Sequence, residues 1–428
     1  MAPIITPHTI RNVVFESGER MPMLVHAGSG MPVFDACVYA ITVVRPSSGS
    51  GATIEQALRS VQFLLAYMSL RSIDLQQRFR TGRFLDLHEL DDLVNMAYRP
   101  LTSRLVCRRE SPLAPKVLSL ERVRKRTPKN QAEDHVAIGT VAIRLYYAYE
   151  FLAWVGQMTA GKVCSTLEQK NYYTKLLEAF LIKLRIRSPK GRTSSNRLSL
   201  SPEQRAELLR VIDPVSADNP WGGEFVRNRN RLLIHWCMGT GIRRGELLRM
   251  GIKLINFRRN IVDIVRQPDN KKDSRKYQPN VKTRERSIGI SEELAYLTHE
   301  HIVKDRSKIR SAQKHDMLFV AKNGNPLSLS AFTKIFRTLR QKHPVIGGKL
   351  SSHVLRHTWN EDFSDVADKA ELSAEDERRA RTHAMGWSDR SKSADIYLKR
   401  RTQRLATEVS IRIQKSVIDG NKEGDLDE

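Results

Sequence analysis

Hydrophobic residues in the first half of the chain recur at the spacing of one face of an α-helix. In two stretches the repeat is three or four residues, which places the apolar side chains along a single stripe. The first stripe comprises Ile54, Leu58, Val61, Leu65 and Met68, and the second comprises Ile138, Val141, Leu145, Ala148, Leu152 and Val155. Residues 53–56 fit a capping box, so the first helix is expected to begin at Thr53. We interpret both stripes as core packing, which predicts a helical bundle over residues 51–185.

The first 50 residues have shorter hydrophobic segments. Residues 22–26 and 36–44 are mostly apolar, and they flank the turn-forming sequence Gly28-Ser29-Gly30. This pattern predicts a small strand-and-turn element over residues 1–50. Residues 46–51 have the sequence PSSGSG, which is typical of a flexible joint. Helical structure is therefore expected to begin after this joint.

A basic stretch rich in serine separates the predicted bundle from the rest of the chain. Residues 181–201 have the sequence LIKLRIRSPKGRTSSNRLSLS, and residues 186–200 within it have the composition of an interdomain linker. Ser201, Pro202 and Gln204 then supply a serine cap, a proline at the first helical position and the residue that closes a capping box. A new helix, and with it a second domain over residues 201–407, is expected to begin here.

The second domain combines helical and alternating patterns. A helix is expected over residues 227–250, and residues 252–257, 261–265 and 287–290 alternate as the strands of a small antiparallel sheet do. Helical patterns resume after Ser291. The fold class predicted for the whole chain is therefore mainly α, with a small antiparallel β-sheet in the second domain.

The chain is expected to finish, over residues 408–428, with the end of a helix and an acidic tail. An apolar stripe in this last helix comprises Leu405, Val409, Ile413 and Val417. The stripe can pack on its own domain or on a neighbouring subunit, and the sequence favours neither alternative. Residues 421–428 are acidic and are expected to be disordered.

The length of the chain agrees with this domain organisation, and its net charge indicates the kind of partner it binds. A chain of 428 residues is longer than one hydrophobic core usually supports, which agrees with two domains. Its 72 Lys and Arg residues outnumber its 47 Asp and Glu residues, leaving a net charge of +25. Such an excess favours a polyanionic partner, so nucleic acid is considered first and an anionic membrane second. No basic amphipathic helix supports the membrane, and the longest apolar run, residues 36–44, is far below the ~20 residues of a membrane span.

The N-terminal sequence and the cysteines favour a cytoplasmic protein. The first 20 residues lack the basic start and long apolar block of a secretory signal, and Glu16 and Glu19 argue against a transit peptide. The four cysteines are Cys37, Cys107, Cys164 and Cys237. They lack the spacing of a zinc site or a disulfide framework, so reduced thiols are expected. The predicted location is the cytoplasm, in association with the bacterial nucleoid when DNA is bound.

Two segments of the second domain carry cations suited to a phosphodiester. In residues 239–247 a glycine-bounded helix start presents Arg243, with Glu246 one turn later on the same face. A guanidinium is planar, permanently charged and able to bind two phosphate oxygens. Lys282 lies in a basic turn before a strand, where it could donate a proton to a leaving oxygen. Three nearby lysines are alternatives to it: Lys271, Lys272 and Lys276.

Two later segments add an imidazole, an indole and a phenol. Helical spacing places His353 and Arg356 on one face, so a group capable of acid or base catalysis accompanies a second phosphate clamp. His353 and His357 also stand four residues apart, as zinc ligands can, but no HExxH glutamate or third ligand accompanies them, and no metal site is expected. Trp387 then offers an indole N–H donor, and Tyr397 a phenol that can act as a nucleophile.

In their order along the chain, these segments resemble the tyrosine recombinase family, also called the phage integrases. The family pattern is an arginine, a lysine, His-x-x-Arg, a histidine or tryptophan, and then a tyrosine, and the likeness spans about residues 201–407. TGIRRGEL resembles the first arginine box, HVLRHTW the second and MGWSDRSKSADIY the closing box. The helical region 51–185 is similar in position and pattern to the core-binding, DNA-binding domain of this family.

The resemblance implies a site-specific DNA recombinase or integrase that cleaves and rejoins DNA strands through a 3′-phosphotyrosine intermediate. Its implied groups are the phosphate clamps Arg243 and Arg356, the phosphate hydrogen-bond donors His353 and Trp387, the acid Lys282 for the leaving 5′ oxygen, the nucleophile Tyr397 and the supporting acid Glu246. No cofactor, metal or ATP is implied, because the phosphotyrosine bond conserves the energy of the phosphodiester. The implied partners are double-stranded DNA and further copies of the chain, as a tetramer on synapsed DNA sites.

The chain departs from the family pattern at three places. Trp387 and Tyr397 are one residue further apart than is usual, residues 269–279 lengthen the hairpin before Lys282, and Gly289 stands where proline is common. Two of these departures lie in the hairpin that carries Lys282.

Two other functions use the same kind of residues. A type IB topoisomerase relaxes supercoiled DNA with a very similar set of groups, and a catalytically silent DNA-binding accessory protein could retain the fold. The sequences HVLRHTW and TGIRRGEL favour the recombinase over the topoisomerase. A silent relative has no physical reason to keep every catalytic group, so an active enzyme is expected.

Overall fold

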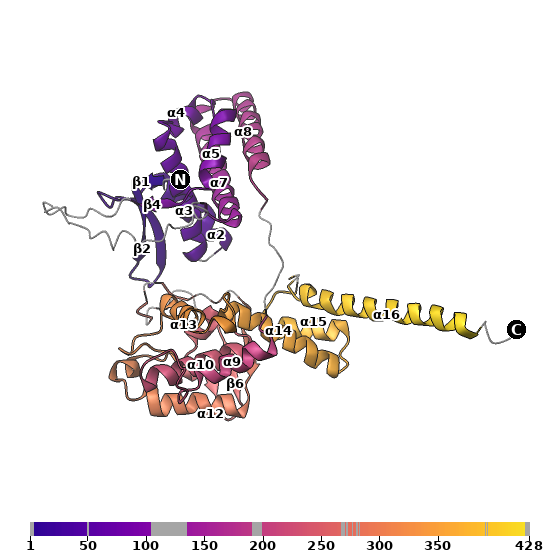
Figure 1. Cartoon of the computed structure of the whole chain (residues 1–428). Helices are drawn as coiled ribbons and strands as arrows, with labels where there is room; N and C mark the ends of the chain where they lie inside the picture. The colour runs from indigo at the N-terminus through magenta and orange to yellow at the C-terminus, as the bar shows by residue number, and fades with distance from the viewer. Residues whose placement is uncertain are drawn as a thin grey trace, which may run out of the picture. The chain divides into compact units, whose positions relative to one another are not determined.

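The computed structural model describes residues 4–48, 51–103, 135–190, 199–266, 270, 273–275, 277–279, 281, 283–389, 391 and 393–423. The chain divides into two compact units, Met1–Ser195 and Asn196–Glu428, here called unit 1 and unit 2. Both units are predominantly helical (Figure 1). The mainly α fold with a small antiparallel sheet in unit 2 confirms the fold class predicted from the sequence.

Unit 1 is a helical bundle in which the long helix α7 packs against α3 and α8. Its helices are α1 (Phe34–Tyr39), α2 (Arg45–Ser48), α3 (Gly51–Leu70), α4 (Leu75–Arg80), α5 (Leu87–Ala97), α7 (Ile138–Val163) and α8 (Leu167–Arg187). The predicted stripes form its core: Leu58 and Val61 of α3 and Leu145 and Leu152 of α7 are fully buried. Burial of each side chain of this kind contributes about 1.5–3 kcal/mol, so the stripes account for much of the stability of the bundle.

Two ends of these helices differ from the prediction. α3 begins at Gly51, so Thr53 lies inside the helix and does not cap it. The first turn of α3 packs near Arg20 and Pro22 of the preceding strand, and this tertiary contact extends the helix beyond the local cap signal. Ile138, predicted to be in the core, is 44% exposed because it is the first residue of α7.

The N-terminal residues form strands, and one of them, β3, includes the predicted apolar segment 22–26. β2 (His8–Val14) and β3 (Arg20–His26) pair antiparallel, from His8 opposite His26 to Val14 opposite Arg20. β1 (Ile4–Thr6) pairs in parallel with β4 (Leu101–Ser103). β3 packs on α3, so this small sheet is part of the fold of unit 1.

Residues 36–44, predicted to belong to the strand-and-turn element, are helical instead. They lie in α1 and in a π-helical turn, η1 (Ala40–Val44), and α2 follows at once. The buried side chains of this stretch are Ala36, Cys37, Tyr39, Ala40 and Val44. This spacing matches one face of a helix and not the alternation of a strand, so helical structure begins before the predicted joint.

Unit 2 consists of helices around a short three-stranded sheet. Its longer helices are α9 (Pro202–Ile212), α10 (Glu224–Thr240), α11 (Arg244–Arg249), α12 (Glu292–Glu300), α13 (Leu329–Lys342), α14 (Ser352–Lys369), α15 (Ala374–Met385) and α16 (Asp395–Glu423). Short turns of 3₁₀-helix or π-helix are η3 (Ile252–Leu254), η4 (His301–Arg306), η5 (Arg310–Lys314) and η6 (Pro344–Ile346). α9 begins with the predicted capping box, in which the Ser201 side chain accepts a hydrogen bond from the backbone N–H of Gln204.

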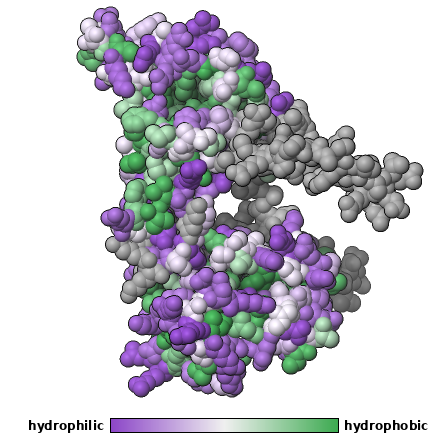
Figure 2. All heavy atoms as spheres, turned by 90° about the vertical axis from the view of Figure 1, so that its left-hand side faces the viewer, coloured by the Kyte–Doolittle hydropathy of each residue, from purple (hydrophilic) through white to green (hydrophobic). Residues whose placement is uncertain are grey.

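The sheet of unit 2 has the order β5 (Ile255–Asn256), β6 (Ile261–Ile264), β7 (Arg286–Gly289), and all its pairs are antiparallel. These strands lie within the predicted segments or within one residue of them. The helix predicted over residues 227–250 is interrupted, because α10 ends at Thr240 and α11 begins only at Arg244. Hydrophilic residues spread over the visible face of unit 2, the lower part of Figure 2, with few hydrophobic residues between them.

Two predicted boundaries fall inside helices. α8 continues to Arg187, because Leu181 and Leu184 are buried in the core of unit 1, while residues 191–198 of the predicted linker lie outside the described residues. α16 runs unbroken across residue 407 to Glu423, so residues 421–423 of the predicted disordered tail are helical. Residues 424–428 are not among those described.

Two other sequence observations have structural counterparts. Cys37 and Cys237 are buried free thiols and Cys164 is a half-buried one, whereas Cys107 is outside the described residues. Among the described helices, none combines the length and the apolar character needed to cross a lipid bilayer.

The close packing of α7 on α8 can be tested at a helical glycine. A Cβ at Gly156 would lie 2.5 Å from a methyl carbon of the buried Leu177, whereas a Cβ at Gly161 of the same helix would meet nothing within 4 Å. Overpacking costs about 1–3 kcal/mol, against a gain of about 1 kcal/mol from helix propensity. In urea unfolding, Gly156→Ala should therefore lower the free energy of unfolding of unit 1 and Gly161→Ala should raise it. Equal effects of the two substitutions would contradict this packing.

Candidate active site

The first arginine box lies at the junction of α10 and α11. Gly241 follows α10 in the left-handed conformation, with φ of 59°. A Cβ at this position would lie 2.9 Å from the Trp359 ring and 3.0 Å from the side chain of Met385. Both the backbone conformation and the available space therefore require glycine. The turn at Gly241 places Arg243 at the N-cap of α11, where the sequence predicted a helix start.

Two arginine side chains converge on one backbone carbonyl. Arg243 donates from Nη1 to the carbonyl oxygen of Met385 at 2.8 Å. Arg356, on α14, approaches the same oxygen with Nη2 at 3.5 Å and donates from Nη1 to the carbonyl oxygen of Gly241 at 2.6 Å. Burial, reinforced by the charge of Arg243, lowers the pKa of Arg356 to about 9. The two guanidiniums thus form a partly desolvated cationic centre that a bound anion would stabilise.

The phenol of Tyr397 lies beside this centre, in the same chain. Tyr397 is in the first turn of α16, and its Oη is 2.8 Å from Nδ1 of His357. Nε2 of His357 is in turn 3.0 Å from Nε2 of His353. The Tyr397 phenol interacts electrostatically with the guanidiniums of both Arg243 and Arg356. Folding therefore gathers the predicted nucleophile, histidine and arginines at one place.

Aromatic and cationic groups hold the tyrosine ring from two sides. The ring of Trp387 stacks on that of Tyr397, with centroids 6.2 Å apart and an interplanar angle of 12°. Trp387 also lies under Arg356, whose Cζ is 5.8 Å from the indole. Cζ of Arg381, which is buried and paired with Glu377, is 5.1 Å from the Tyr397 ring. These contacts fix the ring against α14 and α15.

Glu246 is the buried acid of the site. Its carboxylate pairs with Arg286 at 2.9 Å, and both side chains are almost completely buried. It also accepts hydrogen bonds from the Thr283 hydroxyl at 2.6 Å and from the backbone N–H of Arg243 at 3.0 Å. Burial would raise the pKa of this carboxyl group, but the hydrogen bond and charge of Arg286, with the Thr283 bond, outweigh it and leave the pKa below its usual value. Glu246 is therefore a carboxylate that joins α11 to the segment before β7.

The same network reaches α15. Arg286, the first residue of β7, donates from Nε to the carbonyl oxygen of Ala384 at 2.8 Å. The backbone N–H of Arg284 donates to the carbonyl oxygen of Gly386 at 3.2 Å. The end of α15, which supplies the Met385 carbonyl to the arginine pair, is thus fastened to the sheet.

The predicted lysine and its alternatives lie outside the described residues, so the structure gives no position for Lys282, Lys271, Lys272 or Lys276. The two neighbours of Lys282 are described. Val281 is buried, and Thr283 is bonded to Glu246. The backbone on both sides of Lys282 is therefore attached to the site.

The longer connection before Lys282 is also anchored where it is described. Arg275 is buried, pairs with the buried Asp273 at 2.6 Å, and donates from Nη1 to the carbonyl oxygens of Leu248 and Leu327, both at 2.9 Å. The carbonyl oxygen of Pro279 accepts a bond from Arg249 at 3.4 Å. The described parts of residues 269–279 are therefore packed against unit 2.

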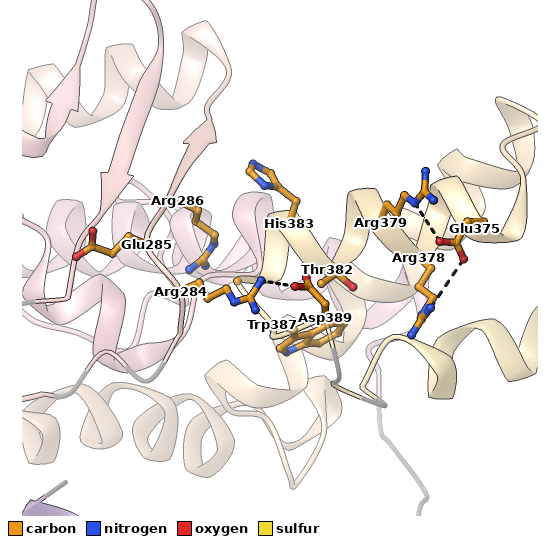
Figure 3. Close-up of a pocket in the computed structure, with 11 residues that line it drawn as sticks. Arg284, Glu285, Arg286, Glu375, Arg378, Arg379, Thr382, His383, Trp387 and Asp389 are labelled. Carbon is orange, nitrogen blue, oxygen red and sulfur yellow. Dashed lines mark hydrogen bonds and ion pairs between the residues drawn. The ribbon is translucent and has the colours of Figure 1, made fainter. Parts of the chain in front are cut away.

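A pocket of about 360 Å³ lies beside the site, between the segment leading into β7 and α15 (Figure 3). Trp387 contributes to its wall, and its arginines are Arg284, Arg286, Arg378 and Arg379. Arg284 pairs with Asp389 at 2.8 Å, which links the segment before β7 to the loop of Trp387. Glu375 pairs with both Arg378 and Arg379. The Arg284 pair therefore joins two segments around Trp387, whereas the Glu375 pairs lie within α15.

Sequence reasoning missed three groups of the site. His357 was considered only as a zinc ligand, although its helical spacing from His353 already indicated that the two rings meet. Arg286 is part of the basic turn around Lys282 but was given no role in the site, and neither was Arg381. Within the part of the chain that the structure describes, a group of three metal-ligand side chains occurs only at Asp86, His88 and Glu89 of unit 1.

The charge of Glu246 can be tested by the pH dependence of stability. Glu246→Gln keeps the shape but leaves Arg286 buried without its counter-charge, which should cost about 3–5 kcal/mol of unfolding free energy at pH 7. The pKa of Glu246 is lowered in the folded state, so its contribution is complete above the unfolded value of ~4.3 and is lost as the pH falls through the folded value. In urea unfolding from pH 7 to pH 3, the difference between the wild type and Glu246→Gln should shrink as the pH falls.

The matched control is Glu292→Gln, at an exposed position of α12, which should change stability by no more than about 0.5 kcal/mol. A difference between the wild type and Glu246→Gln that stays constant down to pH 3 would contradict the buried carboxylate.

Two of the solved structures with a detectable likeness to this chain are complexes of recombinases with DNA. The post-cleavage complex of the XerH site-specific recombinase with a palindromic difH substrate is 17% identical, with a TM-score of 0.42, and the likeness covers 88% of this chain and 94% of that one. The Tn1549 transposon integrase in complex with circular intermediate DNA is 15% identical, with a TM-score of 0.36, covering 65% of this chain and 92% of that one.

Sequence comparison matches part of the chain to a known family. Residues 223–404 match the model of the phage integrase family. The tyrosine recombinase XerD of Haemophilus ducreyi is 25% identical over 166 residues, which are 37% of this chain and 50% of that protein. XerD of Halalkalibacterium halodurans is 26% identical over 151 residues, which are 35% of this chain and 46% of that protein, so the chain matches about half the length of these relatives. The arginine, histidine and tyrosine boxes that gather at one site lie within the matched range, so residues 223–404 carry a domain of the phage integrase, or tyrosine recombinase, family.

Proposed function

We propose that the chain is a site-specific DNA recombinase or integrase that cleaves and rejoins DNA strands through a 3′-phosphotyrosine intermediate. The observation that carries the proposal is the position of the Tyr397 hydroxyl, 2.8 Å from His357 and beside the guanidiniums of Arg243 and Arg356 in the same chain. A phenol next to two converging arginines can attack a phosphorus atom whose oxygens those arginines bind.

The arginine pair supplies the electrostatic part of the reaction. Ionising a tyrosine of pKa ~10 at pH 7 costs about 4 kcal/mol, and hydrogen-bond donors aimed at a developing charge return about 2.7–4 kcal/mol each. Arg243 and Arg356 bind backbone carbonyls, and the scissile phosphate would take over part of this hydrogen bonding. His353 and Trp387 would donate to its other oxygens. The phosphotyrosine bond keeps the energy of the phosphodiester, so rejoining needs neither ATP nor a metal ion.

Lys282 is the proposed proton donor to the leaving 5′ oxygen. Its neighbour Thr283 bonds to Glu246, which also accepts the backbone N–H of Arg243. Lys282 is therefore the sequence neighbour of a residue that is linked, through Glu246, to the start of α11, where Arg243 lies. Among Lys271, Lys272 and Lys276, none adjoins a residue bonded to Glu246.

Double-stranded DNA is the proposed partner. The net charge of +25 and the family of residues 223–404 both favour it. Phosphate contacts would supply most of the affinity, with both units contributing basic residues, and groove contacts would supply the sequence preference.

We also propose that α16 binds a second copy of the chain, as a recombinase that acts as a tetramer on two synapsed sites requires. Figure 1 shows α16 extending away from the other helices of unit 2. Along it, Val409, Ile413 and Val417 are each more than half exposed, and they belong to the stripe predicted from the sequence. Among the described residues, the contacts of α16 with α14 and α15 leave these side chains uncovered. Burial against another subunit would remove this apolar surface from water.

The nucleophile is tested with nicked DNA that traps the covalent intermediate. The wild type should form a complex that resists denaturation and is linked through a 3′ phosphate, and Tyr397→Phe should abolish it, because the phenolic oxygen forms the bond. DNA binding should be unchanged in a mobility-shift assay. Tyr296→Phe, at an exposed position of α12, is the control and should cleave like the wild type. Covalent attachment of the Tyr397→Phe protein would refute the assignment.

The stripe on α16 is tested by comparing two faces of one helix. Val409→Ser with Ile413→Ser removes the proposed contact, whereas Ile411→Ser with Ile418→Ser removes exposed apolar residues from the opposite face. Sedimentation velocity with DNA sites should give oligomers for the wild type and the second variant, and separate protein–DNA complexes for the first. Full assembly by the first variant would rule out this interface.

A further inference from the structure

Tyr397, His357 and His353 form a continuous line of hydrogen bonds from the nucleophile toward the surface. Tyr397 Oη is 2.8 Å from Nδ1 of His357, and Nε2 of His357 is 3.0 Å from Nε2 of His353. His357 is 8% exposed, whereas His353 is exposed. Because its two ring nitrogens face different partners, His357 can accept a proton on one side and release another on the opposite side.

We propose that His357 is a further catalytic residue, the base that takes the proton of Tyr397 while it passes its own proton to His353. The proposal rests on the phosphotyrosine mechanism described above. At the start, the Tyr397 hydroxyl donates to Nδ1 of His357, and Nε2–H of His357 donates to Nε2 of His353. This assignment of tautomers uses both hydrogen bonds of the line and leaves all three groups neutral.

Protons and bonds balance in each direction. During cleavage, a bond forms between Tyr397 Oη and phosphorus while the bond from phosphorus to the 5′ oxygen breaks. The phenolic proton moves to Nδ1 of His357, and the Nε2 proton of His357 moves to His353, which becomes an imidazolium. The 5′ oxygen takes its proton from the acid proposed to be Lys282. In rejoining, the 5′ hydroxyl returns its proton to that acid as its oxygen bonds to phosphorus, the bond from phosphorus to Tyr397 Oη breaks, and the same line returns the phenolic proton.

Electrostatics favour His353 as the final site of the charge. The charged groups around the Tyr397 end of this line are Arg243 of the α11 start, Arg356 of α14 and Arg381 of α15, with the acids Glu246 and Glu377 paired to Arg286 and Arg381. A positive charge on the buried His357 would be desolvated and repelled by these cations. On the exposed His353 it is solvated and can face the phosphate.

The relay therefore couples two roles that the sequence assigned separately. The proton removed from the nucleophile makes His353 a charged donor when the phosphate gains negative charge. A charged donor forms a stronger hydrogen bond to a phosphate oxygen than a neutral one does. His357 thus generates the nucleophile, and through His353 it also strengthens the phosphate clamp.

The first test replaces the base with a group that keeps its hydrogen bond. In His357→Asn the amide oxygen can occupy the place of Nδ1 and accept a bond from Tyr397, but it cannot take the proton. The rate of single-turnover cleavage of nicked DNA should fall by about 10²–10⁴-fold, the usual contribution of a general base. DNA binding should not change. The control His299→Asn, at an exposed position of α12, should cleave at the wild-type rate.

A second measurement separates proton transfer from a structural effect. Without the base, only tyrosine that is already ionised can attack, so the His357→Asn rate should rise about tenfold per pH unit below the tyrosine pKa of ~10. Replacing Tyr397 with a fluorinated tyrosine that ionises near neutral pH should then restore most of the lost rate. The same replacement should have little effect when His357 is present.

The possible outcomes distinguish a failure of the proton relay from a failure of the proposed phosphotyrosine mechanism. If the wild type forms no covalent complex, or Tyr397→Phe still forms one, the proposed function fails and the relay with it. If the wild type cleaves through Tyr397 while His357→Asn keeps the wild-type rate and pH profile, the relay alone is wrong. A slow His357→Asn protein that the fluorinated tyrosine does not rescue also overturns the relay, because the loss is then one of positioning.

Discussion

The buried ion pair between Glu246 and Arg286 is the interaction on which the rest of the site depends. Its carboxylate accepts the backbone N–H that sets the position of Arg243, and the Thr283 hydroxyl beside Lys282. Its guanidinium holds the carbonyl of Ala384 at the end of α15. Three segments far apart in the sequence are thus joined at two side chains. Breaking a buried ion pair leaves one charge uncompensated. Loss of either side chain is therefore expected to displace all three segments from their positions in the site.

That anchoring gathers positive charge where the fold supplies little negative charge to match it. Arg243 and Arg356 both direct N–H groups toward Met385, and their guanidiniums meet carbonyl dipoles there, not a carboxylate of their own. Glu246, the buried acid beside Arg243, is engaged mainly with Arg286, since its contact with the Arg243 side chain is the longer one at 3.5 Å. Cations held mainly by dipoles retain a preference for an anion. A phosphodiester supplies that anion with oxygens that two guanidiniums can share.

The sequence allowed most of the site to be predicted, because each of its boxes is a short local pattern. A glycine before Arg243, the spacing of His353 and Arg356, and the late Tyr397 could all be recognised without coordinates. What remained hidden depends on tertiary contacts. Gly241 interrupts the predicted helix because Trp359, more than a hundred residues later, fills the space of a Cβ. Residues 36–44 are helical because one of their faces packs in the core of unit 1. A short apolar run fits both a buried helix and a buried strand, so the sequence alone does not distinguish them.

The proposed nucleophile and the proposed assembly surface lie on a single helix. Tyr397 stands in the first turn of α16, and the exposed residues Val409, Ile413 and Val417 lie further along it. The first turn is held by an ion pair from Asp395 to Arg378, at 3.3 Å, and by the stacking of Trp387 on the tyrosine ring. A partly exposed pair of this kind contributes little stability. In the proposed assembly, a partner that covers the distal stripe would bear on the same helix that positions the phenol, so binding at α16 would be coupled to the alignment of Tyr397 with the phosphorus.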